Sequence, residues 1–490
     1  MLMYRTEFTT SSVFLVSLAL LLSLSVALVN CGGNMVSGQV NNGMGSLTVT
    51  ITDPPSCAFP NGDFDHAFIS IRSVQAHTSA TATDNTPGWQ ELVPQLNTAP
   101  VQVDLFALGN NACLLNTLGS NTALPAATFQ QIRLLLVAND GSSGAVPATN
   151  ACTNQGFNCV VLHDGSIHEL QLSSQANTGL KIPPGQIVGG PITVQAGQDV
   201  DLNIDFNACA SIIQEGNGDF RLKPALTAGQ VSSNNTGISG QVVDAATSMP
   251  IVGGTVLVAL EQLDSSGDDV IIMQAAADSS GNFNFCPLPT GATFDVVTVA
   301  INGAGLAYDA TVAIGVPGGT SLGMIPLSAE TGASTAPAAF QGFVTTTTGS
   351  ATVVIDASVF ALQSVNTGSG TRPVTIPAEG ASAGFLSVES NSACPAGAPM
   401  NANCAQYTLI VPASNPSVGI FSSGKISYAA PAAGDVLYSV RADAASPLSG
   451  GTADCSPSSQ TTSFDASGNP LKAVAGATVT PKELDFFGCS

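Results

Sequence analysis

The most regular patterns in the chain alternate apolar and polar residues, as expected of β-strands that bury one face. In Ser46–Thr52 the apolar positions are Leu47, Val49 and Ile51. In Asp199–Phe206 the even-numbered positions are apolar. The polar positions of that strand are therefore expected on an exposed sheet face: Asp199, Asp201, Asn203 and Asp205.

Further strands are expected between joints rich in Gly and Pro. They lie at Phe64–Val74, Val101–Leu105 and Ile132–Val137, and, toward the end of the chain, at Val353–Val359, Tyr407–Val411, Ile426–Tyr428 and Val436–Val440. One short helix is expected at Asn207–Gln214. This pattern predicts an all-β protein of tandem antiparallel β-sandwich domains, Greek-key, transthyretin-like or immunoglobulin-like, and argues against a helical or parallel-sheet fold.

Composition shifts divide the chain into three expected domains, at residues 45–230, 237–327 and 339–490. Linkers are expected at residues 231–236, which are rich in Ser and Asn, and at residues 328–338, which contain Thr, Ala and Pro.

The N-terminus has a mainly apolar run without charged residues, Val13–Val29, behind Arg5 as its only cation. The run ends at Leu28, Val29 and Asn30, and Cys31 follows. This resembles the bacterial lipoprotein signal, with Asn30 where that pattern usually has Gly, Ala or Ser. The resemblance implies a signal peptide at residues 1–30, lipidation of Cys31 and a flexible tether at residues 31–44. A membrane is then a partner through the lipid, and the expected location is the bacterial cell envelope, as an outer-membrane or surface lipoprotein.

The formal net charge is −22, with 11 Lys and Arg against 33 Asp and Glu. Nucleic acid is not expected as a partner, because phosphate binding requires clustered cations. No other apolar run approaches the roughly 20 residues that span a bilayer.

Eleven cysteines are present, and setting Cys31 aside leaves an even number, which suits disulfides outside the cytoplasm. Spacing suggests three local pairs and one longer pair: Cys152 with Cys159, Cys394 with Cys404, Cys455 with Cys489, and Cys57 with Cys113. Cys209 and Cys286 then remain, either as a bridge between the first two domains or as two buried thiols.

The first domain resembles the family called domain of unknown function 4382. The match is carried, in chain order, by Gly45–Asp53, Gly88–Trp89, Val103–Leu105, Leu124–Ala126, Gln131–Leu134, Thr178–Lys181, Asp201–Phe206 and Leu222–Pro224. The resemblance implies a β-sandwich on an envelope lipoprotein and implies no activity.

The second domain resembles the carboxypeptidase regulatory-like domain, a small transthyretin-like sandwich. This match is carried by Gly240–Asp244, Pro250–Gly253, Val256–Val258, Asp278–Phe285, Leu288–Gly291 and Phe294–Val299. It implies a spacer or accessory role without peptidase activity. The third domain resembles no family that its residues identify, and its immunoglobulin-like assignment rests on composition.

No catalytic residue, cofactor or metal is assigned. Gly319–Gly323 fits the nucleophile-elbow pattern around Ser321, but no histidine follows His168, so a hairpin turn is expected there. Candidate metal ligands lie at His163–His168, at His66 with Asp63 and Asp65, and among Asp199, Asp201 and Asp205. Exposed loops and an exposed sheet face explain these groups more simply. The acidic segments Asp264–Gly267 and Asp278–Gly281 are expected to be turns.

Three residues are candidates for ligand binding: Trp89, Arg133 and Lys181. Trp89 is the only tryptophan, and the other two are rare cations in an acidic domain. Packing of Trp89 and pairing of the cations with Asp are the simpler interpretations. The sequence thus predicts a non-catalytic, lipid-anchored envelope protein that acts as a surface binding or structural module, with a glycan or protein ligand. A carbohydrate-binding surface receptor and an envelope hydrolase are the alternatives.

Overall fold

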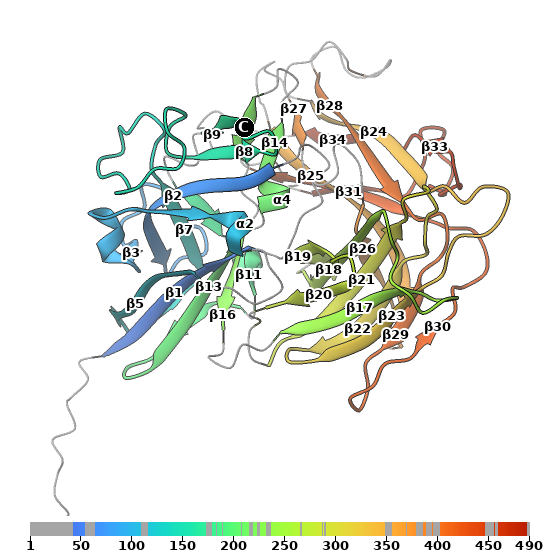
Figure 1. The fold of residues 1–490 in the computed structure, drawn as a ribbon, viewed down its shortest axis with the longest axis horizontal. Coiled ribbons are helices and arrows are strands. Elements are labelled where there is room, and N and C mark those ends of the chain that lie inside the picture. Colours follow the sequence, from blue (N-terminus) through green and yellow to red (C-terminus); the bar gives the residue numbers. More distant parts are fainter. Residues whose placement is uncertain are drawn as a thin grey trace, which may run out of the picture.

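The structure is a computed structural model. It describes residues 43–53, 64–108, 116–172, 179–182, 184–188, 190–206, 208–214, 219–222, 226–231, 237–264, 267–286, 288, 291–347, 355–368, 370–378, 386–388, 394, 402–445, 455 and 459–487. Figure 1 shows the first unit, coloured blue to green, beside the second and third units, coloured yellow-green to red.

The first unit consists of two main sheets. The five-stranded sheet has the order β11 (Ile187–Val188), β16 (Leu226–Gln230), β13 (Asp199–Phe206), β1 (Met44–Thr52) and β5 (Asn116–Pro125). The nine-stranded sheet has the order β10 (Leu180–Ile182), β7 (Gln131–Leu136), β2 (Phe64–His77), β8 (Cys159–Leu162), β9 (Ile167–Leu172), β15 (Phe220–Leu222) and β14 (Ile212–Gln214), with β3 (Gln90–Glu91) and β4 (Val101–Asp104) also on β2. A small pair joins β12 (Ile192–Val194) to β6 (Ala127–Phe129).

The helices of the first unit are short. They are α2 (Leu105–Leu108), α4 (Ala208–Ser211) and 3-10 turns at Pro94–Asn97 and Pro184–Gln186. One core, to which Ile51, Ile69, Leu134 and Ile204 belong, lies between the two main sheets, so the unit is a β-sandwich.

The second and third units are connected through one large sheet. The three-stranded sheet of the second unit is β20 (Asn282–Phe285), β17 (Ile238–Asp244) and β23 (Ser321–Leu327). The eleven-stranded sheet runs β30 (Tyr428–Ala429), β29 (Ser417–Ile420), β22 (Thr311–Pro317), β21 (Thr293–Ile301), β18 (Thr255–Leu263), β19 (Asp269–Ala276), β26 (Thr371–Ile376), β25 (Ile355–Asn366), β31 (Ser439–Ala445) and β32 (Ser459–Thr462), with β27 (Leu386–Val388) on β25. The four-stranded sheet has β28 (Ala402–Val411) and β24 (Ala338–Thr347), with β33 (Thr478–Val479) and β34 (Leu484–Phe487) also on β24.

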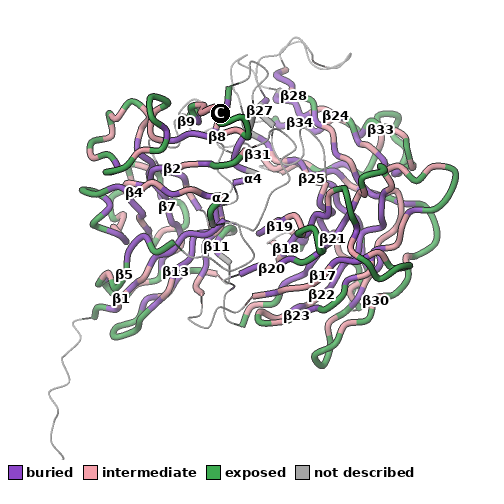
Figure 2. Tube along the Cα trace, in the orientation of Figure 1, coloured by how far each residue is buried: buried purple, intermediate pink, exposed green. Residues whose placement is uncertain are grey.

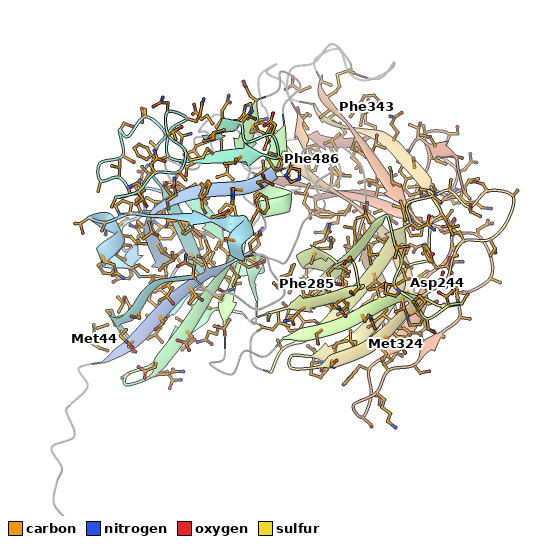
Figure 3. The ribbon with its side chains drawn as sticks, viewed as in Figure 1. Met44, Asp244, Phe285, Met324, Phe343 and Phe486 are labelled. Carbon is orange, nitrogen blue, oxygen red and sulfur yellow. A yellow bond between two sulfur atoms is a disulfide. The ribbon has the colours of Figure 1, made fainter. Side chains whose placement is uncertain are left out.

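Strands β18, β21 and β22 are buried on both faces. In β21, Val296 and Ala300 belong to the core beneath the three-stranded sheet, whereas Val297 and Val299 belong to the core of the third unit. Phe285 and Phe486, both labelled in Figure 3, lie in these two cores and are fully buried. The central strands appear mostly buried in Figure 2, while loops at the rim are exposed. The second and third units therefore share a sheet and a core.

The all-β prediction of tandem sandwiches is confirmed, with one difference in strand direction. Several strand pairs are parallel, including β1 with β13, β17 with β23 and β22 with β29. The sheets are mixed because these partners are far apart in sequence and do not form hairpins.

All five strands predicted in the first unit are present, as β1, β2, β4, β7 and β13. The predicted helix Asn207–Gln214 is wrong in its second half, where Ile212–Gln214 forms β14. In the third unit, the strands expected at Ile426–Tyr428 and Val436–Val440 begin later, at Tyr428 and Ser439.

The predicted exposure of one face of β13 is also wrong at its C-terminal end. Asn203 and Asp205 are both only 5% exposed, whereas Asp199 is exposed as expected. The alternation of residues is as predicted, but this end of the outer face is buried. Alternation identifies the two faces of a strand without showing whether the polar face is covered.

The segment expected as a linker at residues 328–338 packs against both neighbouring units. The Glu330 amide donates to the Ala307 carbonyl at 2.9 Å, and its carboxylate accepts a hydrogen bond from the Ala413 amide. The side chain is 4% exposed. Burial, with a smaller contribution from Asp309, raises the pKa of Glu330 to about 7 from an ordinary value of 4.5. The joint thus holds a buried acid between the units.

We predict that Glu330→Gln raises the free energy of unfolding at high pH relative to the native chain. Because the folded state binds this proton more tightly than the unfolded state, its contribution to stability is full below pH 4.5 and is lost as the pH rises through 7. Glutamine keeps the acceptor and carries no charge. Urea unfolding should show similar stability for variant and native chain at pH 4, and a gain of up to roughly 3 kcal/mol for the variant at pH 8. Asp435→Asn, at an exposed carboxylate, is the control, and a gain that does not depend on pH would contradict the prediction.

Candidate functional site

The structure brings together the three residues that the sequence suggested for ligand binding. Lys181 on β10 is directly opposite Arg133 on β7. The guanidinium carbon of Arg133 lies 4.1 Å from the centre of the Trp89 ring, as in a cation–π contact. Trp89, Arg133 and Lys181 are half-buried, and together we call them the Trp89 cluster.

Hydrogen bonds fix the Trp89 cluster to the loop between β2 and β3. Arg133 Nε donates to Gln75 Oε1 at 2.7 Å, and Arg133 Nη1 donates to the Asp84 carbonyl at 3.2 Å. Trp89 Nε1 donates to the Thr83 carbonyl at 3.1 Å. The guanidinium and indole groups thus hold the loop against the sheet.

Cations and acids are closely spaced around this cluster. Lys181 Nζ lies 2.7 Å from Asp84 Oδ1, and Glu91 accepts a hydrogen bond from Gln75 at 3.0 Å. Partial burial lowers the pKa of Arg133, an effect that Asp84 and Glu91 oppose. Two cations lie directly opposite each other on neighbouring strands, an arrangement that costs free energy unless anions compensate for it.

The arrangement allows some kinds of binding and disfavours others. One face of the Trp89 ring is covered by Arg133, and the His77 ring lies 5.2 Å away at a tilt. A sugar therefore cannot stack on the face of the Trp89 ring that Arg133 covers. The Lys181 ammonium, at 33% side-chain exposure, can contact an anionic group from solvent. The expectation that the cations pair with Asp is confirmed for Lys181.

The histidines that the sequence suggested as metal ligands form separate contacts. His66 Nδ1 lies 2.7 Å from Asp104 Oδ2, and His163 pairs with Asp65. His168 Nε2 lies 3.0 Å from the Ser166 hydroxyl. Within the described residues, no group of three His, Cys, Asp or Glu side chains is placed to hold a metal ion. Asp63, the other acid close to His66 in the sequence, lies outside the described residues.

The remaining sequence motifs are turns and strands. Ser321 is the first residue of β23, which is a strand and not the helix that a nucleophile elbow requires. Asp278 Oδ1 accepts hydrogen bonds from the amides of Ser280 and Asn282, as in a tight turn. Asp264 likewise closes a turn, accepting a hydrogen bond from the Asp268 amide.

Two of the predicted disulfides are present, Cys152–Cys159 and Cys394–Cys404. Cys286 and Cys455 are also disulfide-bonded. Cys31, Cys57, Cys113 and Cys489 lie outside the described residues, as does the side chain of Cys209.

Sequence reasoning missed a buried ion-pair cluster between the second and third units. Arg372 on β26 contacts Asp269 on β19, with 2.6 Å between Nε and Oδ2, and contacts Asp295 on β21. Fully buried Glu261 accepts a hydrogen bond from the Thr375 amide at 3.2 Å, and burial raises its pKa well above the usual range. The sequence does carry a signal for this cluster, because three otherwise apolar strands each contain an acidic residue. Charged residues are rarely buried unless they are paired.

The fold is that of an all-β protein built from tandem sandwiches. Residues 44–224 match the family model described as Domain of unknown function (DUF4382), which confirms the resemblance of the first unit. No curated protein matches the chain. In the described part of the chain, no helix is long and apolar enough to cross a membrane.

Several solved protein structures show weak similarity. The Bacillus anthracis TIE protein is 10% identical, with 91% of this chain and 51% of that protein covered and a TM-score of 0.15. The shaft pilin SpaA from Lactobacillus rhamnosus GG is 11% identical, with 59% and 98% covered and a TM-score of 0.16. GBS52, the minor pilin of Streptococcus agalactiae, is 10% identical, with 52% and 96% covered and a TM-score of 0.17. This chain spans about half the length of the TIE protein.

Proposed function

We propose that the chain is a non-catalytic, lipid-anchored module of a bacterial cell envelope, with a structural and binding role. The observation that carries this proposal is the joint construction of the second and third units. One sheet passes through both units, and β18, β21 and β22 bury one face in each core. Such a body resists bending at the joint because bending would expose apolar surface. It suits a rigid structural body that follows the first unit, which the tether at residues 31–44 would join to the membrane.

The lipid anchor is the part of this proposal that one experiment can test directly. Cells expressing the native chain or Cys31→Ala are labelled with a fatty-acid analogue and then fractionated. We expect the native chain to carry the label and to sediment with membranes, and the variant to lose both properties. Label that persists in Cys31→Ala, or a native chain recovered unacylated from the cytosol, would contradict the proposal.

A second candidate function, ligand binding by the Trp89 cluster, is favoured by the meeting of two cations in a chain of net charge −22. The ligand chemistry that fits is a carboxylate- or sulfate-bearing glycan that contacts Lys181. A glycan array probed with the native chain and with Lys181→Ala tests this. Saturable binding that is lost in Lys181→Ala and kept in Lys472→Ala, a variant at a distant exposed ion pair, would support it. Equal binding by all three proteins would exclude the cluster.

A further inference from the structure

His77, the last residue of β2, lies at the base of the loop that carries Trp89. This loop spans residues 78–89, and we call it the Trp89 loop. His77 is 6% exposed. Its Nδ1 accepts a hydrogen bond from the Ser79 amide at 2.9 Å, and its Nε2 lies 3.1 Å from the Pro87 carbonyl oxygen. One imidazole ring therefore joins the beginning of the loop to its end.

The two contacts of His77 fix where its ring carries a proton. A backbone amide only donates and a backbone carbonyl only accepts, so Nδ1 carries a lone pair and Nε2 carries the single proton. The ring is thus neutral, and both of its nitrogens are used. The loop also packs closely on the ring, because a Cβ atom at Gly88 would lie 3.3 Å from Nε2. Turning the ring over would lose both hydrogen bonds.

The Trp89 loop places an acid of its own on the cations of the Trp89 cluster. Asp84 is the only acid among residues 78–89. Its carboxylate lies 2.7 Å from Lys181 Nζ, and its backbone carbonyl accepts a hydrogen bond from Arg133. An anionic ligand of the cluster would need the same contact with Lys181. While the loop is closed, Asp84 therefore takes the place of a ligand carboxylate or sulfate.

A proton on Nδ1 of His77 would break this arrangement. Two N–H groups would then face each other, and the hydrogen bond from the Ser79 amide would be lost. The ring would also become a buried cation, which is strongly unfavourable without a partner. Within the described part of the chain, no acid forms an ion pair with His77. The charged side chains on the elements around it are three cations and two acids: Arg72, Arg133, Lys181, Asp84 and Glu91.

We propose that His77 is a proton-sensitive clamp that regulates the Trp89 cluster by holding Asp84 of the Trp89 loop on Lys181. Histidine is the side chain that ordinarily changes charge between pH 5 and 8. A neutral ring keeps the loop closed. A protonated ring releases the loop, and Lys181 then becomes open to an anion from solvent. The regulation of binding rests on the second candidate function, whereas the clamp itself does not.

Fluorescence of the full chain tests the clamp without any ligand, because Trp89 is the only tryptophan. Emission and its quenching by acrylamide are measured from pH 7.5 to pH 5.0. In acid we expect a red shift and an at least roughly twofold rise in the quenching constant, both reversed on return to pH 7.5. Far-ultraviolet circular dichroism should stay constant, because the sheets remain folded. Unchanged quenching across this pH range would overturn the proposal.

His77→Asn provides a variant whose side chain cannot take up the proton. Its amide oxygen can accept the Ser79 hydrogen bond at either pH, so the rise in quenching in acid should disappear. His163→Asn is the matched control, at a side chain that is 58% exposed, and should keep the native response. If His77→Asn does not fold, nitrogen-15 NMR of the native chain decides, because the clamp requires the Nε2–H tautomer of His77 at pH 7.5. The Nδ1–H tautomer, or a rise in quenching that persists in folded His77→Asn, would overturn the proposal.

Binding to dextran sulfate, a sulfate-bearing polysaccharide, tests the regulation. We expect the native chain to bind at least roughly threefold more tightly at pH 5.5 than at pH 7.5, and Asp84→Asn to show the tighter binding already at pH 7.5. His77→Asn should show no such rise, which separates the clamp from the general loss of negative charge in acid. Binding that does not depend on pH, or Asp84→Asn that binds no more tightly than the native chain at pH 7.5, would overturn the regulation. A native fluorescence response without any dextran sulfate binding would instead overturn ligand binding by the Trp89 cluster.

Discussion

Arg372→Ala is expected to lower the free energy of unfolding by about 3–5 kcal/mol, because it leaves Asp269 and Asp295 buried without their partner. Asp269 is 1% exposed and Asp295 is 5% exposed on their side chains, so water cannot replace the guanidinium. The lost contacts join β26 to β19 and β21, and the damage therefore falls on the seam between the second and third units. Urea unfolding at pH 7, followed by far-ultraviolet circular dichroism, measures the change.

The matched control is Lys472→Ala, which removes an ion pair with Asp435 at the surface. The two side chains are 47% and 66% exposed, and exposed pairs contribute about 0–1 kcal/mol. The contrast between the two variants isolates the effect of burial. An Arg372→Ala loss no larger than that of Lys472→Ala would show that the pair at the seam is open to solvent.

The predictable part of the fold is the part that residue alternation encodes. The patterns at Ser46–Thr52 and Asp199–Phe206 correctly gave two central strands of the first sheet and their core faces. One sequence pattern does indicate that the second and third units share strands. Val256 to Leu260 is an unbroken apolar run, which is typical of a strand buried on both faces. The resemblance to a small sandwich instead predicts that this run is one strand of a separate domain.

The site was harder to predict because it depends on pairings between distant segments. The sequence distinguishes Trp89, Arg133 and Lys181 only because each is a residue type that is rare in this domain. Nothing in their spacing shows that β10 lies beside β7. The same limit applies to Asp205, whose place on the polar face was correct and whose burial depends on residues elsewhere in the chain. Local periodicity shows which residues share a face of a strand. Packing between segments far apart in the sequence decides which of these faces are buried.

The shared core predicts that damage in the third unit reaches the strands of the second. Phe340 on β24 is fully buried, and its ring packs edge-on against Tyr438 with 5.2 Å between ring centres. It belongs to the same core as Val297 on β21 and Val312 on β22. Phe340→Ala should therefore cost about 3–5 kcal/mol and destabilise both units together.

Hydrogen exchange followed by mass spectrometry distinguishes shared from separate units. In Phe340→Ala, amide protection in β21 and β22 should fall by the same free energy as in β28, because the strands unfold as one cooperative body. Phe464→Ala, at a side chain that is 50% exposed, should change neither region measurably. Loss of protection confined to the third unit would show that the two units unfold independently in spite of their continuous sheet. Since residues 328–338 pack against both units through Glu330, a uniform loss of protection should extend across this joint as well.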